Sequence, residues 1–210
     1  MGRGGTEMDA PNRRLLLHVV MAVCAIAVAV AAVLVFLPRD AAGGRTVVSG
    51  IAPGGPFRLV NQNGAVVTDA DLKGKPFAVF FGFTHCPEIC PTTLWEMSQA
   101  LKDLGPDADR LSVAFVSVDP ERDRPEMLKQ YLQSFDPRIM GLTGTPEEAA
   151  AAAKAYRVYW RRVPTSDGDY TMDHSAMVYL MDRDGQFTDT IAYGSPAADR
   201  LAALRRLIAG

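Results

Sequence analysis

Apolar positions along the chain fall into blocks that switch between the periodicities of strands and of helices. Short, almost continuous apolar runs predict buried strands at 77–83, 111–118, 140–143 and 177–181. Amphipathic helices are predicted over 92–104, 125–135 and 145–160, with a last helix starting at Ser195-Pro196. The third of these helices opens with Thr145, Pro146 and Glu148, which supply a cap, a first-turn proline and a capping-box carboxylate.

Two hairpins complete this pattern. Residues 57–68 alternate around Asn63-Gly64, a dipeptide typical of tight hairpin turns, and Asp184-Gly185 connects strand 177–181 to a strand over 186–193. Strands that alternate with helices and end in a hairpin and a helix indicate an α/β domain. We therefore expect a thioredoxin-like fold with an extra N-terminal β-hairpin over residues 56–210.

The N-terminal part of the chain has a different character. Residues 15–37 form an apolar run interrupted only by His18, and about 20 apolar residues suffice to cross a bilayer. Arg13 and Arg14 precede the run and place residues 1–14 in the cytoplasm by the positive-inside rule. A cleaved signal peptide is the alternative, but its apolar core is normally shorter. We predict a single-pass anchor in the cell membrane, a linker over 38–55 rich in glycine, alanine and proline, and a domain on the extracytoplasmic, periplasmic side.

Charge and cysteine content narrow the candidate chemistry. The formal net charge of −2 gives no electrostatic basis for nucleic-acid binding. Three cysteines are present, and Cys24 lies within the apolar run, so Cys86 and Cys90 are the pair available to the domain. They follow strand 77–83, where a turn opens the next helix and the helix dipole favours thiolates. A structural disulfide would close a very small loop and stabilise little, so a redox-active pair or a site for a soft metal is favoured.

His174 is the candidate third member of this site. It precedes strand 177–181, and in a thioredoxin-like sheet the loop before that strand faces the thiol-bearing turn. Two thiolates and one imidazole suit copper or zinc, whereas a purely structural histidine is the alternative. His85 is a further candidate ligand, although its side chain is expected to point away from that of Cys86. Two features weaken a purely redox role: no proline immediately precedes strand 177–181, and three residues rather than two separate the thiols.

Four segments together resemble the Sco/SenC family of membrane-anchored, thioredoxin-fold copper chaperones. They are G-F-T-H-C-P-E-I-C-P, V-S-V-D-P-E-R-D-R-P, A-Y-R-V-Y-W-R-R-V and D-Y-T-M-D-H-S-A-M-V-Y-L-M-D, within residues 50–208. The resemblance implies a copper ion bound by Cys86, Cys90 and His174. It also places Asp119 near the site as a residue that supports the ligands, with a simple turn role before Pro120 as the alternative. Arg124 stands where the family usually has threonine, and this departure touches no ligand.

The same resemblance implies a function. Family members are copper chaperones for cytochrome c oxidase, so we expect a metallochaperone, not an enzyme, that delivers copper to the dinuclear copper site of oxidase subunit II. The alternative is a thiol-disulfide reductase that keeps the cysteines of that subunit reduced, which needs Cys86 and Cys90 but not His174. A membrane-bound redox or copper sensor is a third hypothesis. Other copper chaperones or thiol reductants are the further partners to expect.

Overall fold

The structure is a computed structural model that describes residues 21, 23, 24 and 52–210. The predicted tail, most of the predicted anchor and most of the predicted linker therefore lie outside the described residues. Among the described residues, no helix is long and apolar enough to cross a membrane. The chain divides into two compact units, Met1–Thr46 and Val47–Gly210. The anchor, its orientation and the domain boundaries remain predictions.

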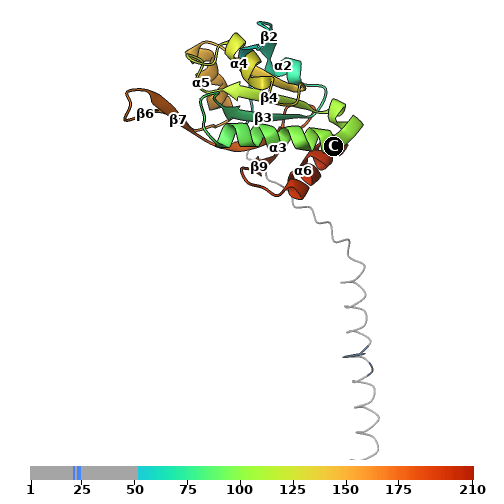
Figure 1. Ribbon diagram of the computed structural model, residues 1–210. Helices are drawn as coiled ribbons and strands as arrows, with labels where there is room; N and C mark the ends of the chain where they lie inside the picture. Colours follow the sequence, from blue (N-terminus) through green and yellow to red (C-terminus); the bar gives the residue numbers. More distant parts are fainter. Residues whose placement is uncertain (1–20, 22, 25–51) are drawn as a thin grey trace, which may run out of the picture. The chain divides into compact units, whose positions relative to one another are not determined.

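A seven-stranded sheet forms the centre of the second unit (Figure 1). Its strand order is β2-β1-β5-β4-β3-β8-β9. Strands β3, β4 and β5 run parallel, and β8, β9 and the β1–β2 hairpin add antiparallel neighbours at the two sides. The strands are β1 (Arg58–Asn61), β2 (Val66–Thr68), β3 (Phe77–Gly82), β4 (Ser112–Ser117), β5 (Ile139–Thr143), β8 (Met177–Met181) and β9 (Phe187–Ala192). The predicted α/β architecture and its N-terminal hairpin are confirmed.

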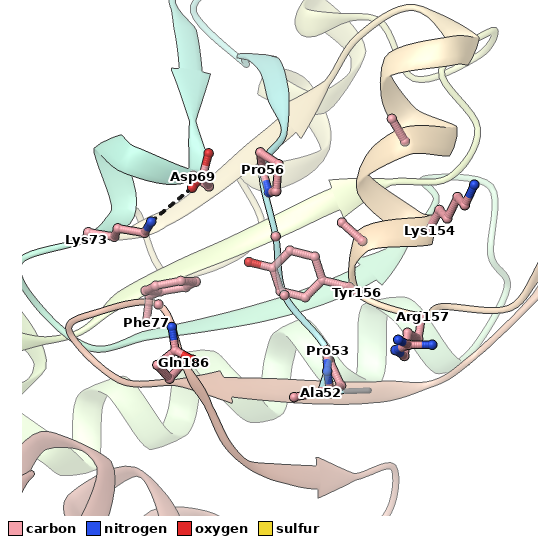
Figure 2. A pocket seen from close by; sticks show the side chains of 15 residues that line it. Ala52, Pro53, Pro56, Asp69, Lys73, Phe77, Lys154, Tyr156, Arg157 and Gln186 are labelled. Atoms are coloured by element: carbon pink, nitrogen blue, oxygen red, sulfur yellow. Dashed lines mark ion pairs between the residues drawn. The ribbon is translucent and has the colours of Figure 1, made fainter. Parts of the chain in front are cut away.

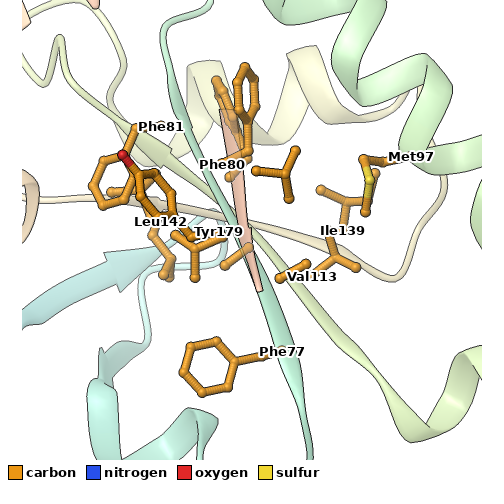
Figure 3. Close-up of a cluster of buried hydrophobic side chains, with 14 of the residues drawn as sticks. Phe77, Phe80, Phe81, Met97, Val113, Ile139, Leu142 and Tyr179 are labelled. Atoms are coloured by element: carbon orange, nitrogen blue, oxygen red, sulfur yellow. The ribbon is translucent and has the colours of Figure 1, made fainter. Parts of the chain in front are cut away.

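The hydrophobic core occupies both faces of this sheet, because successive residues of a strand point to opposite sides. On one face the ring of Phe80 meets that of Phe115 at 5.9 Å, and Phe115 meets Tyr131 of α4 (Pro125–Leu132) at 6.0 Å. On the other face Phe81 lies 5.3 Å from Tyr156 and 6.2 Å from Tyr179. Figure 3 shows this core around β3 and β4. Burial on both faces explains why β3 and β4 are continuous apolar runs.

Helices connect the parallel strands and cover the sheet. They are α2 (Asp69–Leu72), α3 (Ile89–Leu104), α4 (Pro125–Leu132), α5 (Pro146–Ala155) and α6 (Ala197–Ala209), with a 3₁₀ helix, η1, at Gly105–Arg110. Helices α3 and α6 pack against each other. The sequence placed the start of α3 at Thr92, whereas it begins at Ile89. Pro91 is tolerated there because first-turn amides have no intrahelical partner.

The predicted extent of one helix was wrong. The helix expected to reach Trp160 ends at Ala155, and Arg157 adopts a left-handed backbone conformation with φ of 55° that breaks the helical path. Trp160 instead begins a strand, β6 (Trp160–Pro164), which pairs with β7 (Tyr170–His174) as a separate two-stranded sheet. Figure 1 shows this hairpin projecting from the domain. The sequence did not predict it.

Candidate metal centre

The turn after β3 positions the first thiol. Strand β3 is buried along its whole length, and the chain turns immediately after it, where the Cys86 amide donates a hydrogen bond to the Phe83 carbonyl at 3.3 Å. Cys90 lies in the first turn of α3, and its amide donates to Cys86 Sγ at 3.4 Å. A Cβ on Gly82 would stand only 2.8 Å from Cys90 Sγ. The close approach of α3 to the end of β3 therefore sets the position of this sulfur.

His174 reaches the same point from the end of β7. Its Nε2 lies 3.5 Å from Cys90 Sγ, and its Nδ1 lies 3.0 Å from the Ser175 carbonyl oxygen. A carbonyl only accepts, so Nδ1 carries the proton and Nε2 presents a lone pair towards the thiols. The imidazole edge also contacts the rings of Phe83 at 5.8 Å and Phe80 at 6.4 Å between centroids. These contacts fix both the tautomer and the plane of the ring.

Cys86, Cys90 and His174 thus converge from three separate elements. Their donor atoms all lie within 4.8 Å of one another, the arrangement needed to hold one metal ion. Two thiolate sulfurs and one imidazole nitrogen form a soft donor set that suits copper or zinc rather than calcium or magnesium. The chemistry of the donors therefore fits the metal that the sequence predicted.

The two thiols lie in unlike electrostatic surroundings. Cys86 is half-buried, and hydrogen bonds from the Cys90 thiol and from backbone amides lower its pKa to about 4. Cys90 is fully buried, and its pKa is raised, first by its interaction with the Cys86 thiolate and then by burial. The pair therefore holds a single negative charge at neutral pH, located on Cys86.

The other predicted residues lie outside the cluster of three donors. Asp119 is buried and accepts hydrogen bonds from Arg122 Nε at 2.5 Å and from the Tyr170 hydroxyl at 2.8 Å. It therefore contacts the hairpin that carries His174 rather than the donor atoms themselves. His85 is exposed and its Nδ1 pairs with Thr84 Oγ at 3.0 Å.

Sequence reasoning missed Asp123, which shapes the thiol-bearing turn. This carboxylate is completely buried and accepts hydrogen bonds from the Thr84 amide (3.0 Å), the Thr84 hydroxyl (2.6 Å) and the Ser117 hydroxyl (2.7 Å). It ties the segment just before Cys86 to the end of β4, and burial raises its pKa. The available sequence signal was a second aspartate four residues after Asp119.

A sizeable cavity among the described residues lies away from this site. It has a volume of about 740 Å³ and is lined by Phe77, Tyr156 and the Asp69–Lys73 ion pair, among others (Figure 2). Phe77 begins β3, whereas the thiol-bearing turn follows its last residue, Gly82. The lining of the cavity therefore includes none of the three donors. The candidate site is identified by its side chains and not by the size of a cavity.

Residues 49–209 match the family model described as SCO1/SenC. The chain belongs to the SCO1/SenC family. Among its relatives, the mitochondrial protein SCO2 homolog of Mus musculus is 40% identical over 158 residues, which cover 74% of this chain and 62% of the mouse protein. The chain spans less than two thirds of the length of the curated SCO relatives that it matches.

Solved structures of Sco proteins share this fold. The copper-bound structure of Bradyrhizobium japonicum ScoI is 54% identical, with a TM-score of 0.70 over 74% of this chain and 99% of that one. BsSco, a member of the Sco family of cytochrome c oxidase assembly proteins in which a disulfide switch was identified, is 27% identical, with a TM-score of 0.60 over 75% and 94% of the two chains. The family prediction and the α/β fold are thereby confirmed.

Proposed function

We propose that this chain is a membrane-anchored copper chaperone that delivers copper to the dinuclear copper site of cytochrome c oxidase subunit II. The observation that carries the proposal is the convergence of Cys86, Cys90 and His174, with donor atoms within 4.8 Å of one another. Membership of the SCO1/SenC family and the copper bound by the related ScoI support copper as the metal. The oxidase assembly role of the Sco family supports the destination.

The three side chains would act as ligands in different ways. Cys86 offers a thiolate with no prior loss of a proton, because its pKa is about 4. Cys90 has a raised pKa, so copper binding must displace its proton. His174 Nε2 offers its lone pair, because Nδ1–H donates to the Ser175 carbonyl. Copper binding should therefore release about one proton from the pair of thiols at neutral pH.

Transfer to an acceptor follows from the number and exposure of these ligands. Three protein donors leave room for a fourth from a partner, and copper can then move by replacement of one ligand at a time. Cys86 is half-buried whereas Cys90 is fully buried, so the partner's donor would reach the copper on the Cys86 side. Copper keeps its oxidation state throughout such an exchange.

The predicted anchor gives the site its location. Residues 15–37 would hold the domain at the extracytoplasmic surface of the membrane, beside a membrane-embedded oxidase. Other copper chaperones or thiol reductants would supply copper or keep Cys86 and Cys90 reduced on that oxidising side.

The unlike thiols favour a second candidate function, reduction of a disulfide in subunit II. The Cys86 thiolate would attack one sulfur of that disulfide, form a mixed disulfide and release the other sulfur as a thiolate. Cys90, after losing its proton, would attack Cys86 and release the second sulfur. The substrate gains two electrons, and an external thiol must then reduce the Cys86–Cys90 disulfide. His174 has no obligatory part in these steps.

Substitution of His174 separates the two functions. We expect His174→Ala to lose most of its copper affinity while keeping thiol-disulfide exchange, because only copper binding needs the imidazole. His85→Ala is the matched control, since it removes an exposed imidazole next to Cys86. Copper stoichiometry, copper affinity and the rate of disulfide reduction are measured for both variants and the unmodified chain.

Oxidase assembly in cells then tests the destination of the copper. A chaperone predicts that His174→Ala lowers oxidase activity as severely as Cys86→Ser. Normal oxidase assembly in the His174→Ala strain under copper limitation would refute copper transfer and leave the reductase function.

A further inference from the structure

The hairpin that carries His174 needs an anchor. In the part of the chain that the structure describes, β6 and β7 pair with each other and with no strand of the main sheet. An isolated two-stranded hairpin is marginally stable in water, so contacts with the domain must hold it in place. A cavity of about 120 Å³ lies beside Trp160, Met172 and Tyr170, so the packing of the hairpin there is incomplete. At its base, Ser175 and Tyr159 exchange hydrogen bonds of 3.0 and 3.1 Å.

Tyr170 provides the main polar contact between the β6–β7 hairpin and the rest of the domain. Its ring lies between two guanidinium groups, that of Arg122 at 3.7 Å and that of Arg162 at 3.5 Å from the ring centroid. Its hydroxyl donates to the buried carboxylate of Asp119 at 2.8 Å, and its carbonyl accepts from Arg122 Nη1 at 2.9 Å. The Arg162 guanidinium also pairs with Glu121 at 3.1 Å. One side chain of β7 is thus held on both faces and at its tip.

Arg122 joins this anchor to the segment that bears the thiols. Its side chain is only 17% exposed, and its guanidinium also lies over the ring of Phe83, 5.9 Å from the centroid. Phe83 in turn contacts the His174 imidazole, and its carbonyl accepts the hydrogen bond from the Cys86 amide. The Arg122 guanidinium therefore contacts both the segment that leads to Cys86 and the strand that carries His174.

We infer that Tyr170 is a positioning residue for the metal site: clamped between Arg122 and Arg162, it holds β7 so that His174 faces the two thiols. This inference rests on the proposed copper binding through His174. Tyr170 touches none of the three donors and lies on the same strand as His174, so we infer that it acts mainly through His174. We therefore expect its effect on copper affinity to be smaller than the effect of removing the His174 imidazole.

The test is a double-mutant cycle in the full-length chain purified in detergent. Cys24→Ser is used throughout, so that Cys86 and Cys90 are the only thiols. Tyr170→Leu removes the stack and the hydroxyl, and Tyr170→Phe removes the hydroxyl alone. Each is made with His174 present and with His174→Ala. Tyr193→Leu, at a tyrosine that is 41% exposed, is the matched control. Copper(I) affinity is measured by competition with a chromophoric chelator.

We expect Tyr170→Leu to weaken copper binding about tenfold when His174 is present, the scale on which partners of metal ligands act. Tyr170→Phe should lose less, because it keeps both guanidinium contacts. In the His174→Ala background either change should alter the copper affinity by less than about twofold, because the imidazole that Tyr170 positions is then absent. An equal loss of copper affinity in both backgrounds would overturn the inference. So would an unchanged copper affinity in Tyr170→Leu with His174 present, when the unmodified chain binds copper. If Tyr170→Leu fails to fold, Tyr170→Phe carries the same comparison.

A metal-free measurement separates this inference from the proposed function. If the unmodified chain fails to bind copper, the proposed function fails, and the His174 ring signals in nuclear magnetic resonance spectra then decide the positioning role. We expect one narrow set of ring signals in the reduced wild type and in Tyr193→Leu, and broadened or doubled signals in Tyr170→Leu. Unchanged ring signals in a folded Tyr170→Leu protein would refute positioning by Tyr170.

Discussion

Adding a single methyl group at Gly82 should disturb the metal site and the core together. A Cβ there would stand 2.7 Å from the ring of Phe115 and 2.8 Å from Cys90 Sγ, whereas ordinary contacts begin at 3.4 Å. The sulfur would have to move by about 0.6 Å, which exceeds the roughly 0.2 Å within which metal–ligand distances are held. The ring of Phe115 is fully buried and cannot move aside freely.

We therefore expect Gly82→Ala to lower the free energy of unfolding by about 1–3 kcal/mol, as overpacking of a core does. We also expect copper affinity to fall about tenfold or more, on the scale found when the surroundings of metal ligands are changed. Both are measured on the reduced fragment 47–210, the compact unit that holds the site. Urea unfolding without metal gives the stability, and a chelator competition gives the copper affinity.

Gly141→Ala is the matched control for Gly82→Ala. A Cβ on Gly141 would stand 2.6 Å from Leu132 Cδ1, so it crowds α4 instead of the thiols. It should be destabilising yet leave the copper affinity of the folded protein unchanged. Wild-type copper affinity in Gly82→Ala, or an equal loss of affinity in both variants, would show that the packing of α3 on β3 does not set the position of Cys90.

Three further outcomes follow from the thiols and from the predicted anchor. Because the pKa of Cys86 is lowered to about 4, its alkylation by iodoacetamide should stay nearly level from pH 8 down to pH 5 and halve near pH 4, measured in Cys24→Ser protein; a midpoint near pH 8.5 would contradict the lowered pKa. Reduced protein should bind one copper and the Cys86–Cys90 disulfide almost none, because a disulfide offers no thiolate; comparable binding by both forms in a metal analysis would place the site elsewhere. A membrane-impermeant thiol reagent should label reduced Cys86 in intact cells, and labelling only after lysis would reverse the predicted orientation.

The sequence was sufficient for the framework of the domain. Continuous apolar runs gave β3 and β4, and Asn63-Gly64 gave the turn of the N-terminal hairpin, because short-range periodicity and turn preferences reflect local backbone geometry. The extent of α5 was misjudged for the opposite reason. The sequence predicts a helix as far as Trp160, but the alanine-rich run ends at Ala155, Arg157 leaves the helical conformation, and residues from Trp160 onward pair with β7. Strand pairing within the hairpin overrides the helical preference of the preceding residues.

The amino-acid sequence by itself determined which donors are available: two thiols four residues apart at the start of a helix, and one histidine before a late strand. It also determined the family, since motifs spread over residues 50–208 agree with one another. Only the tertiary structure brought Cys90 and His174, 84 residues apart, to 3.5 Å, because that approach depends on the pairing of β3 with β8 and on the anchoring of the β6–β7 hairpin. The structure alone also distinguished the two thiols. A pKa depends on burial and on neighbouring dipoles, and these exist only once distant segments have packed around each sulfur.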